Sequence, residues 1–174
     1  MGLKVGTVKL EEYNLDWNRM FNEEKENLEK IFKDVAIEIE HIGSTSVEGL
    51  SAKPIIDIAV GVKNLAEFEK IKFCFKEPYS VKEDSVYDEI LIRKRVGEDV
   101  TTHLIHVMEI KSERYQNTII FRNYLRSHKE ALKKYEDLKK VLAEKYADNR
   151  KMYTSSKNEF IQEVLKEAKE EYKK

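Results

Sequence analysis

Near the start of the chain, hydrophobic residues recur with the spacing of an α-helix. The residues that follow this period are Trp17, Met20, Phe21, Leu28, Ile31 and Phe32. Asn14 or Asp16 can cap the first turn, because a side-chain oxygen at that position accepts a hydrogen bond from a free backbone N–H group. We therefore predict that the chain opens with an amphipathic helix.

The next two segments have the shorter periods of β-strands. Between residues 36 and 42, Ile37, Ile39 and His41 alternate with glutamates, which predicts a strand with one buried face. Residues 54–62 are nearly continuous Ile and Val, as expected for a strand that is covered on both faces.

A short helix and a β-hairpin are predicted further along the chain. The apolar positions of the helix are Leu65, Phe68 and Ile71. Residues 88–96 and 101–110 both fit strands, and the sequence Gly97-Glu98-Asp99 between them fits the hairpin turn.

From residue 114 onward the pattern is helical, with two apolar stripes. One stripe is made of Leu132, Tyr135, Leu138 and Leu142. The other is made of Phe160, Ile161, Val164, Leu165, Ala168 and Tyr172. We predict an α+β fold over residues 1–174, a single domain with a small mixed sheet, a leading helix and a helical C-terminal half.

The charge composition limits the expected partners. Lys and Arg number 32 and Asp and Glu number 33, so the formal net charge is −1. A balanced chain has no general electrostatic attraction to nucleic acid or to an anionic membrane. We therefore expect neither as a partner, although a local basic patch stays open.

Several features predict a cytoplasmic protein. No apolar run approaches the roughly 20 residues that cross a bilayer, and the N-terminus lacks the apolar core of a signal peptide. Cys74 is the one cysteine, so no intramolecular disulfide can form, in keeping with a reducing compartment. Because Phe73 and Phe75 flank it, we expect a packed rather than a reactive thiol.

The candidate chemistry lies in residues 41–60. Gly43 permits a sharp turn after the first strand, and the free N–H groups of the short helix expected there attract phosphate oxygens. Asp57 lies among Ile and Val, where a charge is costly unless a cation or hydrogen bonds compensate. A divalent metal with bound phosphate would do so. The groups placed to contact phosphate are those of Ser44, Thr45 and Lys53. In the alternative interpretation, the hydroxyls only cap a helix and the lysine is solvated.

Two histidines, His41 and His106, are candidates for proton transfer or metal binding. In a regular strand over residues 101–110, His103 and His106 face opposite sides, so a bulge is needed for both to enter one pocket. We expect His103 to be exposed. His41 and His106 would converge on Asp57 if their strands are neighbours. His41 by itself is more often a core residue than a catalyst.

The run HIGSTSVEGLSAKPIIDIAV, residues 41–60, resembles the signature of the GrpB family of small bacterial and archaeal proteins. The similarity extends over nearly the whole chain. The other matching positions are Tyr13, Trp17 and Phe21, residues 105–107, residues 121–126, residues 135–139 and residues 153–157.

The resemblance implies a fold similar to that of the nucleotidyltransferase superfamily, in which Gly-Ser is followed by Asp-x-Asp or Asp-x-Glu on a strand. In active members, carboxylates hold two Mg²⁺ ions that orient a nucleoside triphosphate and activate a hydroxyl. Gly43 and Ser44 match the phosphate side, and Asp57 matches the first carboxylate, a metal ligand. Ala59 stands where the second acid should be, because residues i and i+2 share a strand face. A two-ion clamp would need a replacement ligand.

Polar positions that recur in the helical half of the family are matched by Arg122, Lys139, Tyr153 and Lys157. The resemblance implies that they contact phosphate or substrate, with Arg122 binding two oxygens at once. The alternative is that they form ion pairs at the surface or between helices. Asn123 stands where the family often has Asp.

Two functions stay open. The first is Mg²⁺-dependent transfer of a nucleotidyl group to an unknown acceptor. The second is a non-catalytic module that binds a nucleotide or another phosphate-bearing small molecule, since a related domain is fused to dephospho-CoA kinase in some bacteria. The sequence leaves open the nucleotide, the acceptor and the oligomeric state.

Overall fold

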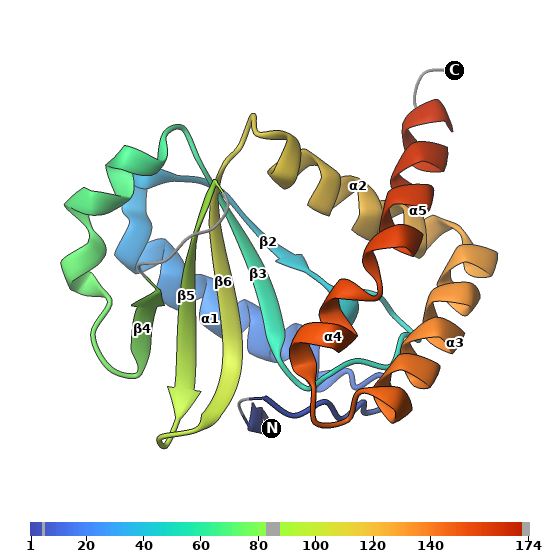
Figure 1. Ribbon diagram of the computed structural model, residues 1–174. Helices are drawn as coiled ribbons and strands as arrows, with labels where there is room; N and C mark the ends of the chain where they lie inside the picture. The colour runs from blue at the N-terminus through green and yellow to red at the C-terminus, as the bar shows by residue number, and fades with distance from the viewer. Residues whose placement is uncertain (5, 83–87, 172–174) are drawn as a thin grey trace.

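The computed structural model describes residues 1–4, 6–82 and 88–171, which form a β-sheet with helices on both sides (Figure 1). The strands are β1 (Leu3–Lys4), β2 (Ala36–Ile42), β3 (Ile56–Val62), β4 (Tyr79–Lys82), β5 (Glu89–Val96) and β6 (Val100–Glu109). The α-helices are α1 (Asp16–Phe32), α2 (Glu113–Ser127), α3 (Lys129–Lys145), α4 (Arg150–Ser155) and α5 (Asn158–Glu171). Short 3-10 helices span Lys33–Val35, Ser44–Ser46, Leu65–Lys70 and Lys72–Cys74.

The sheet is mixed and runs in the order β2-β3-β6-β5-β4, with β1 paired to β6. β3 and β6 are parallel, and the other pairs are antiparallel. β3 is therefore hydrogen-bonded on both sides, which explains why its Ile- and Val-rich sequence is almost wholly buried. The predicted α+β class, leading helix and helical C-terminal half are confirmed.

The two faces of the sheet are covered differently. Trp17, Leu28 and Phe32 of α1 belong to the apolar core on one face, and α1 lies behind the sheet in Figure 1. On the other face, Tyr115 of α2 packs with Ala59 of β3. Helices α2 to α5 gather beside β2 and β3, so this second face is covered only in part.

Two side chains do not lie where the sequence predicted. Ile37 is exposed, because a register shift between Ala36 and Glu38 turns it off the buried face of β2. His103 is 5% exposed, because β6 runs through the middle of the sheet and α1 lies against that face. The prediction that His103 and His106 face opposite sides is confirmed by the strand register.

Two predicted short helices are tighter and shorter than expected. The turn after β2 is the three-residue 3-10 helix Ser44–Ser46, so it has no aligned helix dipole of the kind that attracts anions. The segment predicted as a helix through Ile71 forms the 3-10 helix Leu65–Lys70, and a second 3-10 helix, Lys72–Cys74, follows it. Cys74 in the second is exposed, contrary to prediction, because Phe75 turns inward while Phe73 faces solvent.

The apolar stripes predicted for the C-terminal half are confirmed where the structure describes them. Their buried members are Tyr135, Leu142, Val164, Leu165 and Ala168. Tyr172 lies outside the described residues. In the described part of the chain, no helix combines the length and apolar character needed to cross a membrane.

Candidate functional site

Gly43 follows β2, and with Ser44 it forms a sharp turn, the Gly-Ser corner. This corner lies against Asp57 of β3. Ile42 and Asp57 are register partners in the antiparallel β2–β3 pair, so the turn begins beside the carboxylate. Gly43 has a φ angle of 68°, and a Cβ atom on it would lie 2.6 Å from Asp57 Oδ2. Glycine is therefore required for this approach. Asp57, Gly43 and Ser44 line the same cleft.

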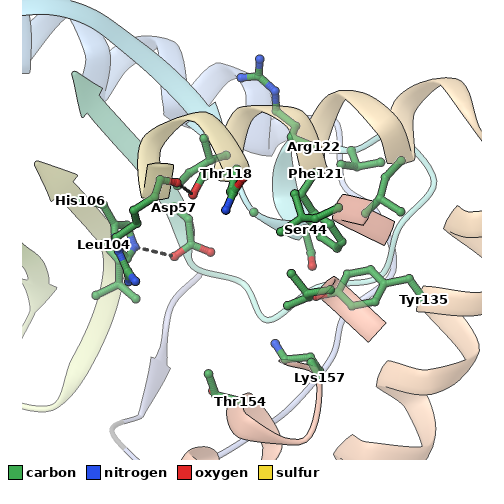
Figure 2. Close-up of a pocket in the computed structure, with 18 of the residues that line it drawn as sticks. Ser44, Asp57, Leu104, His106, Thr118, Phe121, Arg122, Tyr135, Thr154 and Lys157 are labelled. Carbon is green, nitrogen blue, oxygen red and sulfur yellow. Dashed lines mark hydrogen bonds and ion pairs between the residues drawn. The ribbon is translucent and has the colours of Figure 1, made fainter. Parts of the chain in front are cut away.

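The cleft lies between the sheet and the helical half and has a volume of about 900 Å³. Its lining comes from the β2–β3 connection, β3, β6 and all four C-terminal helices. Figure 2 shows Ser44 and Asp57 on one side of the space and Thr154 and Lys157 on the opposite side, with Tyr135 close to Ser44.

His106 is the histidine that reaches Asp57. In the parallel β3–β6 pair, Asp57 is the partner of Leu104, and Ala59 is the partner of His106. His106 Nε2 lies 3.8 Å from Asp57 Oδ1 (Figure 2), and 30% of the Asp57 side chain is exposed to the cleft. Burial opposes ionisation of Asp57. The ion pair with His106, together with the charge of Lys53, nevertheless holds the pKa of Asp57 below its usual range.

Glu89 and Arg114 support His106 on its other side. His106 Nδ1 lies 3.1 Å from Glu89 Oε2, and Arg114 donates two hydrogen bonds to Glu89, at 2.8 and 3.0 Å. Burial opposes protonation of His106, but Asp57 and Glu89 outweigh it and raise the pKa of His106 to about 9. The ring is therefore an imidazolium at neutral pH, and it cannot act as a general base there.

Three further cations line the cleft: Lys53, Arg150 and Lys157. The Nζ atoms of Lys53 and Lys157 lie 5.5 and 4.4 Å from the ring centroid of Tyr153. Burial, followed by the charges of Arg150 and Lys157, lowers the pKa of Lys53 to about 7. Burial also lowers the pKa of Lys157 to about 8, although the charge of Asp57 opposes this. Within the described residues, none of the three forms an ion pair.

Sequence reasoning missed three residues of the site. Arg150 is the first residue of α4, and its backbone N–H donates to the carbonyl oxygen of Gly6 at 3.3 Å, so the N-terminal segment helps to place it. Glu89 and Arg114 are 25 residues apart and meet only because β6 returns the chain beside β5. These are long-range contacts for which the sequence has no local signal.

His41 lies on the other face of the sheet and does not converge on Asp57. Alternation along β2 turns it toward α1, where it stacks on Phe21 with 4.8 Å between ring centroids. Its Nε2 shares a 3.0 Å hydrogen bond with Thr45 Oγ1, and burial lowers the pKa of His41 to about 4. The neutral ring therefore orients Thr45, and of the two predicted histidines only His106 reaches the carboxylate.

Arg122, Tyr153 and Lys157 line the cleft and Lys139 does not, but Arg122 and Lys139 are both engaged within the protein. Arg122 Nη1 lies 2.6 Å from Glu40, and Figure 2 shows its guanidinium turned away from Lys157. Lys139 is fully buried and donates to the carbonyl oxygen of Ser51. These contacts match the ion-pair and interhelical alternative. Direct phosphate contact by Arg122 or Lys139 stays a prediction.

The donor set around Asp57 does not fit the two-ion clamp that the resemblance implies. Ala59 supplies no oxygen at the second acid position, and its register partner His106 presents a positive charge there. Such a charge repels a divalent ion. In the described ranges, no three or more His, Cys, Asp or Glu side chains are grouped so that they could hold a metal. The Mg²⁺ prediction therefore rests on Asp57 alone.

Comparison with known proteins gives consistent relatives. The family described as GrpB protein matches residues 7–167. The chain is 36% identical to the glutamate-rich protein GrpB of Alkalihalophilus pseudofirmus, over 96% of this chain and 99% of that protein. It is 35% identical to the UPF0157 protein YqkA of Bacillus subtilis, over 90% of this chain and 46% of that protein. The crystal structure of conserved protein GrpB from Enterococcus faecalis has a TM-score of 0.85 and 32% identity, covering 95% of this chain and 100% of that one.

We predict that Gly43→Ala destabilises the protein more than Gly97→Ala. The two glycines have φ angles of 68° and 65°, so backbone strain costs about 1–2 kcal/mol in each variant. A Cβ at Gly97 meets no described atom within 4 Å, whereas one at Gly43 meets Asp57. Urea denaturation should show a further loss of about 1–3 kcal/mol for Gly43→Ala. The Gly43→Ala/Asp57→Ala variant should recover part of it. An equal loss in the free energy of unfolding for Gly43→Ala and Gly97→Ala would contradict the close approach of Gly43 to Asp57.

Two histidines should titrate far apart in one NMR experiment. We expect the His106 ring protons to shift near pH 9 and those of His41 near pH 4. Glu89→Gln should lower the His106 midpoint by removing one of its partners. The pKa of His106 in the folded protein lies above the value of about 6.5 in the unfolded chain. The stabilisation that protonated His106 contributes through Asp57 and Glu89 is therefore complete below about pH 6.5. It is lost as the pH rises through about 9. A His106 midpoint near the unfolded value would refute the charged pair.

Proposed function

The chain belongs to the GrpB family, and we propose that its cleft binds the phosphate groups of a nucleotide or a similar phosphorylated small molecule. The observation that carries the proposal is a set of cleft cations without a carboxylate partner in the described chain: Lys53, Arg150 and Lys157. Partly buried like charges repel one another, and each loses solvation. A bound phosphate would offset both costs through charge-assisted hydrogen bonds.

Hydroxyl groups at the corner would add neutral donors. Ser44 and Tyr135 both line the cleft, and Tyr135 of α3 lies close to Ser44 in Figure 2. Burial raises the pKa of Tyr135, so its hydroxyl keeps its proton across the physiological range. Both groups can donate to phosphate oxygens that already face the cations.

The remainder of the cleft suits an apolar or planar group. Its volume of about 900 Å³ falls within the usual range of ligand sites, roughly 300–1,000 Å³. The apolar side chains of its wall include Val47, Phe121, Leu125, Ile161 and Leu165. The cleft therefore has a cationic part and an apolar part. A phosphorylated molecule that also carries a nucleobase can fill both parts, whereas inorganic phosphate can fill only the first.

Calorimetric titration with pyrophosphate and with ATP, both without added metal, tests the proposal. We expect Lys157→Gln and Arg150→Gln each to weaken binding about tenfold or more, because a hydrogen bond to a charged group contributes about 1.5–3 kcal/mol. Lys133→Gln is the matched control, since this lysine side chain is 76% exposed and lies outside the cleft lining. It should leave the affinity unchanged. If neither anion binds the wild-type protein, the proposal is wrong.

The same titrations should detect proton uptake at pH 8. The pKa values of Lys53 and Lys157 are about 7 and about 8 in the free protein, so both are partly neutral at that pH. A bound anion favours the charged form and raises both pKa values. Buffers of different ionisation enthalpy should therefore report protons taken up at pH 8 and almost none at pH 6, where both lysines are already charged.

Nucleotidyl transfer is a second candidate, favoured by the contact between the Gly43 corner and Asp57. In such a reaction, an acceptor hydroxyl oxygen would bond to the α-phosphorus. The bond to pyrophosphate would break, and pyrophosphate would leave with the electron pair. Asp57 is the base placed to take the hydroxyl proton, because His106 is already protonated. Lys53 and Lys157 would hold the charge of the leaving group.

Pyrophosphate release from nucleoside triphosphates, with Mg²⁺ and a broad set of acceptors, separates the two functions. If transfer occurs, Asp57→Asn should slow release about 100-fold or more. The exposed Asp137→Asn change is the control and should have no effect. Binding by the wild-type protein without release from any nucleotide would instead support a non-catalytic accessory module.

A further inference from the structure

A row of register partners leads from Asp57 across the sheet to an arginine. Asp57 of β3 pairs with Leu104 of β6, and Leu104 pairs with Arg93 of β5. Register partners share a face, so all three side chains lie on the side of the sheet opposite α1. Leu104 lines the cleft, as Figure 2 shows. Arg93 therefore lies on the same surface, one strand beyond the cleft.

Arg95 and Arg150 lie near Arg93. Arg95 is two residues further along β5, and Arg150 begins α4 at the cleft. Burial and then the charges of Arg95 and Arg150 lower the pKa of Arg93, so both of these guanidinium groups are within electrostatic range of Arg93. The charge of Arg150 also acts on Lys53 and on Asp57. The arginine cluster is therefore continuous with the cations of the cleft.

None of these three arginines has an ion-pair partner among the residues that the structure describes. Each is half-buried, and Arg95 Nε is buried with no hydrogen-bond partner. The chain has one more acidic than basic residue, so carboxylates are not scarce. In Figure 1, helices α2 to α5 leave the side of β5 that faces away from α1 uncovered. An anion extending from the cleft can reach the cluster without displacing a helix.

We infer that Arg93, Arg95 and Arg150 form a second anion subsite that continues the cleft, so that the natural ligand carries a chain of phosphates rather than one. The inference rests on the proposed function, because the first phosphate must lie with Lys53 and Lys157. Arginine suits this second subsite, because its planar guanidinium group can bind two phosphate oxygens at once. The ligand class is an oligophosphate, such as the triphosphate of a nucleotide.

Calorimetry with inorganic phosphate, pyrophosphate and tripolyphosphate, without metal, tests the subsite. In the wild-type protein we expect tripolyphosphate to bind about tenfold more tightly than pyrophosphate. The Arg93→Gln/Arg95→Gln variant should reduce this step to about twofold, the size of a screened surface effect. Its affinity for inorganic phosphate should stay the same. Lys157→Gln should weaken the binding of all three probes.

Arg19→Gln is the control, because Arg19 is an exposed arginine of α1 on the other side of the sheet. This variant should keep the full tenfold difference in affinity between tripolyphosphate and pyrophosphate. Arg93→Lys/Arg95→Lys, which keeps both charges and is the variant to use if the glutamine pair does not fold, should give an intermediate step. A full tenfold step in both double variants would overturn the inference and leave the cleft proposal standing. If none of the three probes binds the wild-type protein, the proposed function itself is wrong.

Discussion

β3 and β6 pair in parallel in the middle of the sheet, and this pairing determines which charged side chains meet in the cleft. Each side chain on the two strands lies either under α1 or on the opposite face, which holds the cleft and the contacts with α2. With this register, Ile58 and Ile105 lie in the apolar core under α1. Asp57 and His106 lie on the cleft side, in the neighbouring register pairs Asp57–Leu104 and Ala59–His106. A slip of one residue would turn Asp57 into the apolar core, where its charge would be unbalanced. The hydrophobic pattern of β3 therefore also fixes the position of the carboxylate.

The charges around the cleft are balanced in one part and unbalanced in another. In the balanced part, acids and bases alternate through direct contacts, in the order Asp57, His106, Glu89 and Arg114. In the unbalanced part, cations share the lining without carboxylate partners in the described chain: Lys53, Arg150 and Lys157. The first group holds its geometry without a ligand. The second group lacks such partners, and this imbalance is the observation behind the proposed anion site.

Strand periodicity predicted much of this arrangement but not all of it. The alternation over residues 101–110 separated His106 from His103, and the continuous run of β3 placed Asp57 on an interior strand. Alternation shows that two faces exist, but not which one a helix covers. For that reason His41 was expected beside Asp57, although it lies under α1. Arg150 depends on how the start of α4 docks near the N-terminal segment, and such a contact has no counterpart in local sequence.

Ala59 and His106 have to be interpreted together, because they are partners across the β3–β6 pair. The resemblance implies an acid at residue 59 that would help Asp57 to hold metal ions. Here the neighbouring position carries an imidazolium whose pKa is about 9, so the positive charge beside Asp57 belongs to the protein. A fixed cation of this kind stabilises a bound phosphate about as well before a reaction as during it, and uniform binding does not accelerate chemistry. The pair therefore favours ligand binding over nucleotidyl transfer, the reverse of the order that the Gly-Ser and Asp57 spacing alone would suggest.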